Sequence, residues 1–140
     1  MARRTAFSLI ELVIVIVIIG IIAAIAVPRF SRGAEGAAET ALADNLSTLN
    51  KAIELYATEH GGAYPPADKV VNALTMYSDD SGDVAVSGGS GYIYGPYLRT
   101  VPPMPMGPQR GLNTVAVAAG SGVAWVYDPA TGEFTANTAP

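Results

Sequence analysis

A long apolar stretch near the amino end constrains this 140-residue chain more than any other feature of its sequence. Residues 12–27 contain no charged side chain, and residues 7–27 contain only one, Glu11. About 20 apolar residues in a helix are enough to span the hydrocarbon core of a bilayer. The stretch therefore predicts a membrane-spanning helix at residues 7–28, and Pro28, which removes a backbone donor, is expected to kink it.

The residues before this stretch are few and basic, with Arg3 and Arg4. A secretory signal peptide also has a basic head, but its apolar core is shorter, at roughly 7–15 residues, and small residues follow at its cleavage site. Residues 20–26 offer small side chains, so an ordinary signal peptide is an alternative. Glu11 argues against it, since a carboxylate at the edge of an apolar span costs free energy unless it is paired. Glu11 either lies at the level of the lipid headgroups or has a dedicated partner.

The rest of the composition excludes several kinds of functional site. The chain has no Cys, which excludes a disulfide framework, a thiolate zinc site and a cysteine nucleophile, and it has a single His. It has 8 Lys and Arg residues against 12 Asp and Glu residues, so it offers no basic face for a nucleic acid. No group of residues suggests a nucleophile with a base and an orienting partner. We therefore expect neither enzymatic activity nor nucleic-acid binding.

The apolar pattern changes after Pro28, and residues 29–60 have the periodicity of an amphipathic helix that ends at Gly61 and Gly62. A continuous helix over residues 7–60 would be roughly 80 Å long. Because so small a domain cannot bury such a helix, its first half needs lipid or other copies of the chain as cover. The second half has an apolar stripe that is short for a coiled coil, so packing on a small domain is favoured. The stripe consists of Leu42, Leu46, Leu49, Ile53 and Tyr56.

The remaining residues, 61–140, are rich in turns and predict a small globular head. Residues 67–77 have the spacing of a short helix, and a Pro-rich crossing follows at residues 95–105. Three strand-like segments come last, at residues 114–118, 123–127 and 133–136. Laid on the apolar stripe as a small antiparallel sheet of about three strands, they close a core. The fold class is therefore α+β, with a long amino-terminal helix packed on that sheet.

The second strand-like segment carries the largest side chain of the chain. Trp125 and Tyr127 share one face of this strand, since side chains alternate along a strand, and Val123 joins them. We expect these three side chains to pack against Leu49 and Ile53.

The densest acidic cluster contains Asp79, Asp80 and Asp83. These three residues are weak candidates for a calcium site, because the segment lacks the ordered spacing and terminal Glu of an EF-hand loop. A solvated loop is favoured. His60 lies at a helix end, where a cation suits the helix dipole, so capping is favoured over catalysis.

The segment from Ala6 to Glu11, AFSLIE, followed by an apolar helix and Pro28, resembles the amino end of type IV pilins and of the pseudopilins of type II secretion systems. The resemblance implies that a prepilin peptidase removes residues 1–6 by cutting between Ala6 and Phe7, and methylates the new amine of Phe7. Family members usually have Gly before the cut. Because Ala is the next smallest residue, cleavage after Ala6 is still expected.

The same resemblance implies that the Phe7 amine pairs with Glu11 of a neighbouring subunit when copies assemble into a filament. An ammonium and a carboxylate are each costly in hydrocarbon, and mutual neutralisation is the simplest remedy. Before assembly the helix would cross the bacterial inner membrane, with lipid around it and the head outside the cytoplasm. The implied partners are copies of the chain, the peptidase, an inner-membrane assembly platform and minor pseudopilins. No cofactor is expected.

Within this family the chain is most similar to a type II secretion pseudopilin, because it is short, lacks Cys and has a Pro-rich middle segment. A type IV pilin for adhesion, motility or DNA uptake is the alternative, and a single-pass membrane-anchored binding domain is the alternative from another class. Major pseudopilins bind calcium with a Pro-Trp-Gly-type segment and an acidic loop near the carboxyl end. Here Pro105-Met106-Gly107 replaces the Pro-Trp-Gly-type segment, and the acidic loop near the carboxyl end is missing. Both departures put calcium binding in doubt.

Overall fold

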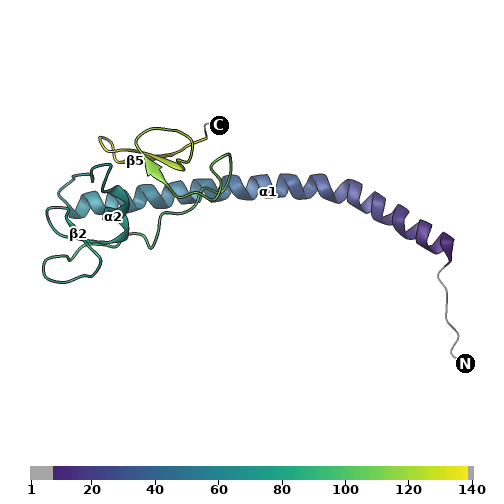
Figure 1. Ribbon diagram of the computed structural model, residues 1–140, viewed down its shortest axis with the longest axis horizontal. Coiled ribbons are helices and arrows are strands. Elements are labelled where there is room, and N and C mark those ends of the chain that lie inside the picture. The colour runs from purple at the N-terminus through teal and green to yellow at the C-terminus, as the bar shows by residue number, and fades with distance from the viewer. Residues whose placement is uncertain (1–7, 139–140) are drawn as a thin grey trace, which may run out of the picture. The chain divides into compact units, whose positions relative to one another are not determined.

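A computed structural model describes residues 8–138 of the chain, in two compact units that divide between Ala37 and Ala38. The first described element is helix α1, Leu9–Glu59, which is assigned as helix without a break across that division (Figure 1). The first unit contributes only the amino-terminal part of α1, where the residues from Leu9 to Ile25 are all exposed. The second unit contains the rest of α1, a short helix and two small sheets.

Helix α1 confirms the predicted long helix and ends where the paired glycines predict. Gly61 has a φ of +66°, the left-handed conformation in which helices commonly end. The Gly62 N–H then donates to the Ala57 carbonyl at 2.7 Å, five residues back, which is the hydrogen bond of a Schellman motif. The helix is stopped by backbone geometry that Gly adopts without strain.

The apolar stripe of α1 forms one wall of the core of the second unit. Leu49, Ile53 and Tyr56 are buried, and Leu42 and Leu46 are partly buried against the same cluster. Helix α2, Val70–Thr75, adds Val70, Ala73 and Leu74 to this core and is shorter than the predicted residues 67–77. The stripe therefore packs on a small domain, as its length predicts.

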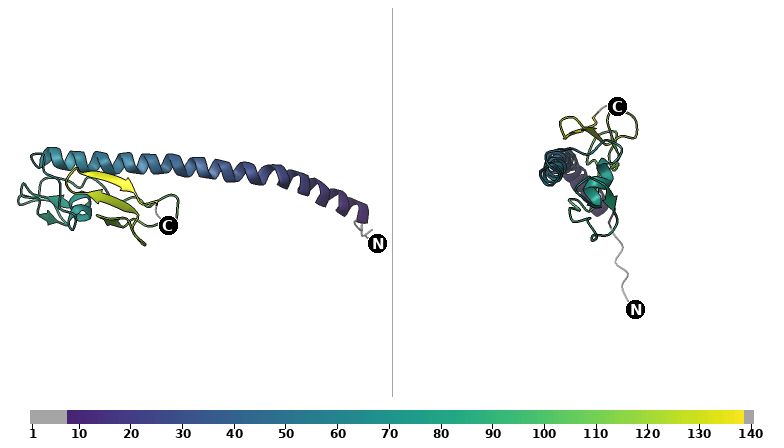
Figure 2. Two further views of the ribbon diagram at one scale, coloured as in Figure 1. Left: turned by 90° about the horizontal axis from the view of Figure 1, so that it is seen from above. Right: turned by 90° about the vertical axis from the view of Figure 1, so that its left-hand side faces the viewer.

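Two small sheets complete the second unit. Strands β1 (Tyr77–Ser78) and β2 (Val84–Ala85) form an antiparallel pair that the sequence does not predict, and β1 begins at the last residue of the predicted helix 67–77. A three-stranded sheet has the order β3-β4-β5, with β3 at Val115–Ala116, β4 at Trp125–Asp128 and β5 at Glu133–Ala136. Figure 2 shows β5 running beside the second half of α1. The α+β fold class is confirmed.

The prediction of a fully antiparallel sheet is wrong for one pair, because β3 and β4 run parallel. The chain reverses in a turn closed by the Val123 N–H and the Gly120 carbonyl. It then returns to the beginning of β3, where the Thr114 carbonyl accepts hydrogen bonds from the N–H groups of Ala124 and Trp125. Strand β4 therefore starts level with β3 and runs in the same direction. Within the three-stranded sheet, the β4–β5 pair is antiparallel, with Tyr127 opposite Phe134.

Trp125 and Tyr127 are fully buried and belong to the same core cluster as Leu49 and Ile53, as predicted. Each polar atom of the two aromatic side chains is satisfied, since Trp125 Nε1 donates to the Pro102 carbonyl at 2.8 Å. The Tyr127 hydroxyl donates to the Pro65 carbonyl at 2.9 Å. Val123 is only partly buried and lies before the strand. The core thus joins α1, β4 and the Pro-rich segments.

Candidate assembly site at the amino end of α1

Glu11 lies in the first turn of α1, and its carboxylate accepts a hydrogen bond from the Ser8 backbone N–H at 3.3 Å. This contact is half of a capping box, in which a Glu three residues after the cap satisfies an N–H that has no partner within the helix. The first-turn position also places a negative charge at the positive end of the helix dipole. The Ser-x-x-Glu spacing before an apolar run is a signal that the sequence analysis missed.

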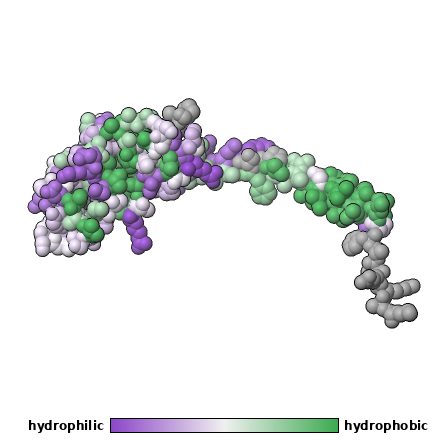
Figure 3. Space-filling model, in the orientation of Figure 1, coloured by the Kyte–Doolittle hydropathy of each residue, from purple (hydrophilic) through white to green (hydrophobic). Residues whose placement is uncertain are grey.

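The apolar residues after Glu11 cover the whole circumference of the helix. Large apolar side chains from Leu9 to Val27 are between 43% and 80% exposed, so none of them packs against another part of the described chain. Figure 3 shows that the visible face of this part of α1 is mostly hydrophobic. A surface of this kind marks a contact with a membrane or with other proteins. Among residues 8–138, α1 is the one helix long and apolar enough to cross a membrane.

Three predicted features of this end are not settled by the structure. Ala6 and Phe7, the predicted cleavage and methylation positions, lie outside the described residues. Pro28 lies within the continuous helical assignment of α1, and the kink there stays a prediction. The pairing of the Phe7 amine with Glu11 of another copy likewise stays a prediction, since a single chain is described.

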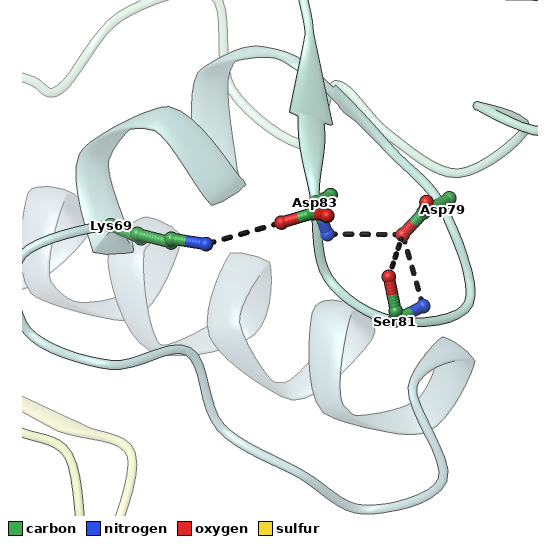
Figure 4. A network of polar contacts seen from close by, with 4 residues as sticks. All are labelled: Lys69, Asp79, Ser81 and Asp83. Carbon is green, nitrogen blue, oxygen red and sulfur yellow. Dashed lines mark hydrogen bonds and ion pairs between the residues drawn. The ribbon is translucent and has the colours of Figure 1, made fainter.

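The acidic loop between β1 and β2 directs its carboxylates to protein partners (Figure 4). One oxygen of Asp79, Oδ1, accepts hydrogen bonds from the Ser81 N–H and hydroxyl and from the Asp83 N–H, at 2.8 to 3.0 Å. The hydrogen bond from the Ser81 hydroxyl is the largest of the causes that lower the pKa of Asp79. Lys69 Nζ lies 3.2 Å from an Asp83 carboxylate oxygen, and the Tyr94 hydroxyl donates to Asp80 at 2.7 Å.

These contacts give each of the three calcium candidates a partner within the chain. No group of three or more His, Cys, Asp or Glu side chains in residues 8–138 is arranged to hold a metal ion. Calcium binding at these residues is not tested by the structure, and the hydrogen bonds explain the loop as an ordered turn.

His60 lies just beyond the end of α1 and connects the helix to this loop. One ring nitrogen, Nδ1, lies 2.8 Å from the Tyr56 carbonyl in the last turn, and Nε2 lies 3.0 Å from the Asp79 carbonyl. The imidazole stacks on the Tyr56 ring with centroids 3.8 Å apart. The contact with a last-turn carbonyl supports the predicted capping role. The contact with Asp79 joins residues 19 positions apart and has no signature in the sequence.

Comparison with known proteins is informative at the amino end of the chain. Residues 1–27 match the family model described as the prokaryotic N-terminal methylation motif. No curated protein and no solved structure matches the chain. The match contains the segment from Ala6 to Glu11 and the apolar run that α1 forms. The amino end of the chain therefore carries the class III signal that is the signature of type IV pilins and pseudopilins.

Proposed function

We propose that the chain is a structural subunit of a type IV pilus-like filament, and within that group a pseudopilin of a type II secretion system. One observation carries the proposal. The methylation signature is joined directly to the amino-terminal part of α1, where the large apolar side chains from Leu9 to Val27 are exposed and the first turn has a single acidic residue, Glu11. The apolar surface of such a helix must be covered by other molecules, first by lipid and then by copies of the helix.

The proposed mechanism transfers the helix from the membrane into a bundle. Cleavage between Ala6 and Phe7 by a prepilin peptidase frees an amine, which would then be methylated. In the bundle this amine pairs with Glu11 of a neighbouring copy, so that two charges costly in hydrocarbon neutralise each other. An inner-membrane assembly platform would extract the subunits, and minor pseudopilins would complete the filament outside the cytoplasm.

Three features support the secretion pseudopilin over an adhesion, motility or DNA-uptake pilin. The chain is short and has no Cys, so the carboxyl-terminal loop is not closed by a disulfide. In the head, the Pro-rich crossing contributes Val101 and Met104 to the core. The Pro102 carbonyl, which belongs to the crossing, also accepts a hydrogen bond from the Trp125 indole N–H. The segment that favours the pseudopilin reading is thus an integral part of the head.

Processing and polymerisation test the filament proposal. Mass spectrometry of the protein from its host membrane should give a mature amino end at a methylated Phe7. Overproduction with the peptidase should then yield filaments visible by electron microscopy. An amino end near Ala26 would indicate an ordinary signal peptide and would overturn the filament proposal.

The choice between secretion and pilus functions needs a separate experiment. Deletion of the gene should abolish the export of a set of folded proteins to the culture medium while surface piliation, motility and DNA uptake persist. Loss of motility or DNA uptake with normal export would assign the chain to a pilus instead. Either result leaves the filament proposal intact, since both machines use the same kind of subunit.

A further inference from the structure

Two polar hollows adjoin each other on the head, and Tyr64 lines both of them. The first has a volume of about 340 Å³, and its walls include Glu54 of α1 and Glu133 at the start of β5. The second has a volume of about 180 Å³, and its walls include Tyr56 and Lys69. Because the two hollows share Tyr64, they form one groove, which we call the Tyr64 groove.

Tyr64 forms a fixed aromatic platform between the two hollows. It is 37% exposed, and part of its ring lies directly on Gly132, where an added Cβ would clash with the ring carbons. Gly132 belongs to the turn between β4 and β5, and its N–H donates to the Asp128 carbonyl at 2.8 Å. The ring is thus supported by an ordered turn, while its exposed part faces the groove. An aromatic ring held in this way is suited to stacking against a ligand.

The second hollow contains a buried hydrogen-bond donor that has no acceptor. Tyr56 is only 4% exposed, yet its hydroxyl has no hydrogen-bond partner within residues 8–138. The hydroxyl lies at the wall of the hollow, since a Cβ added at Gly82, another lining residue, would be 2.7 Å from it. Burial raises the pKa of Tyr56, so the hydroxyl keeps its proton at neutral pH. A ligand oxygen in the hollow would satisfy this donor.

The first hollow supplies acceptors that have no donors. Glu54 and Glu133 are exposed, and neither carboxylate has a hydrogen-bond or ion-pair partner within residues 8–138. Their positions are nevertheless coordinated, because Asn50 of α1 is hydrogen bonded to the backbone of Phe134, the residue after Glu133. The groove therefore combines an aromatic platform, two carboxylate acceptors and one buried donor.

This combination discriminates between classes of ligand. The two carboxylates repel anions, including nucleic acids. A proline-rich peptide would stack on Tyr64, but each Pro lacks the N–H that a carboxylate needs. An organic cation would bind the carboxylates, but it cannot accept from Tyr56 and would meet the charge of Lys69. A pyranose ring offers an apolar C–H face for stacking, and its hydroxyl groups both donate and accept.

We infer that the Tyr64 groove binds a neutral oligosaccharide. One sugar ring stacks on Tyr64, its hydroxyls donate to Glu54 and Glu133, and an oxygen of the sugar accepts from the Tyr56 hydroxyl. The inference goes beyond the proposed function, since it concerns the head alone and does not require assembly.

The full chain, purified in a zwitterionic detergent that has no sugar headgroup, allows a direct test. Saturation-transfer NMR and calorimetric titration would be performed with maltotriose, cellotriose, chitotriose and mannotriose. We expect at least one of these trisaccharides to bind, with an affinity that salt leaves unchanged, because no ligand charge is involved. Decaproline and spermidine represent the two competing classes. Binding of either one without any trisaccharide, or no binding at all, would overturn the inference.

Substitutions locate the bound saccharide. Tyr64→Ala should weaken binding about tenfold, whereas Tyr64→Phe keeps the platform and should retain most of the affinity. Glu54→Gln and Glu133→Gln should each weaken binding several-fold, because a charged acceptor makes the stronger hydrogen bond. Glu39→Gln changes an exposed acid on α1 outside the groove and is the matched control, with no expected effect.

Tyr56→Phe separates a binding role from a structural one. It removes a hydroxyl that has no partner in the head, so affinity should fall several-fold while the urea midpoint of the head does not fall. If Tyr64→Ala fails to fold, the substitutions at Tyr56, Glu54 and Glu133 still decide the outcome. Unchanged affinity in all of these variants would place the saccharide elsewhere and overturn the inference. A chain that binds saccharide but forms no filaments would overturn the proposed function and leave this inference intact.

Discussion

The side-chain amide of Asn50 on α1 is hydrogen bonded to both backbone polar groups of Phe134 on β5. The Phe134 N–H donates to Asn50 Oδ1 at 2.8 Å, and Asn50 Nδ2 lies 3.5 Å from the Phe134 carbonyl. Strand β5 is an edge of the three-stranded sheet, and an edge strand presents unpaired backbone groups. The amide takes the place of a missing neighbouring strand and attaches the sheet to the helix.

Replacing Asn50 by Ala should destabilise the head by about 1–2 kcal/mol, because it leaves the Phe134 N–H without its acceptor. Urea unfolding of a chain that begins at residue 31, monitored by circular dichroism, would measure this loss in the free energy of unfolding. Asn72→Ala on α2 is the matched control: this Asn is exposed, and the change should alter the free energy of unfolding by less than about 0.5 kcal/mol. Equal effects of the two substitutions would show that the bridge to β5 contributes nothing.

Trp125→Ala should cost roughly 3–5 kcal/mol, because the side chain is fully buried and its removal leaves a cavity in the core. Trp125→Phe should cost less, since it keeps part of the volume and loses the hydrogen bond to the Pro102 carbonyl. The same unfolding experiment measures both, with Val117→Ala at an exposed position as the control. If Trp125→Ala unfolded like the parent chain, the indole would have to be exposed in solution and free to contact a partner.

The buried hydroxyl of Tyr127 predicts a stability loss in alkali. Burial raises the pKa of Tyr127 to about 12, above its ordinary value of 10.0. The folded state therefore holds this proton more tightly than the unfolded state. The contribution of the protonated Tyr127 hydroxyl to the free energy of unfolding is complete below about pH 10 and is lost as the pH rises through about 12. The stability advantage of the parent chain over Tyr127→Phe should shrink across that range in urea unfolding. Because the other tyrosines remain in both proteins, a constant difference would show that Tyr127 does not titrate in this way.

Gly95 is required by a close approach of two backbone segments. It has a φ of +69°, and a Cβ added there would lie 2.8 Å from the Met76 carbonyl oxygen. Gly107 has a similar φ of +77° but open space around it. Both Ala substitutions carry the strain of the left-handed conformation, about 1–2 kcal/mol. Gly95→Ala should lose clearly more stability in urea than Gly107→Ala, and equal losses would place the Met76 carbonyl elsewhere.

The parts of the fold that the sequence predicts are those set by local periodicity. The limits of α1 follow from the apolar run and from Gly61 and Gly62, and the buried face of β4 follows from alternation at Trp125 and Tyr127. The direction of β3 could not be predicted, because it depends on how the chain returns to Thr114, a contact without a local pattern. Asn50 was overlooked for the same reason, since its partner lies 84 positions away.

In the candidate site, too, features that are local in the sequence were predictable and contacts between distant residues were not. Glu11 and the apolar helix are adjacent in sequence, so their combination was predicted. The capping contact with Ser8 was also readable from its spacing and was missed. The acidic loop was identified correctly as an acidic cluster, but Lys69 and Tyr94, which neutralise or bind its carboxylates, each lie 14 positions from their partners.

Glu11 has two roles that a single pair of substitutions separates, capping α1 and supplying charge for assembly. Glu11→Gln keeps an oxygen that accepts from the Ser8 N–H, since Gln serves in a capping box as Glu does, but it removes the charge. Glu11→Val removes both. Because α1 is exposed here and the head begins well beyond, neither change should impair membrane insertion or folding of the head.

If charge pairing controls assembly, Glu11→Gln should fail to form filaments as completely as Glu11→Val. The amine of a neighbouring Phe7 would enter the apolar bundle unpaired, and deleting one member of a buried pair typically costs about 3–5 kcal/mol, repeated at every subunit. Cleaved, membrane-inserted protein should remain at normal levels in both variants, as measured by mass spectrometry and fractionation. Electron microscopy would count the filaments. Normal filaments from Glu11→Gln, with none from Glu11→Val, would show that the capping contact matters and that the charge of Glu11 does not.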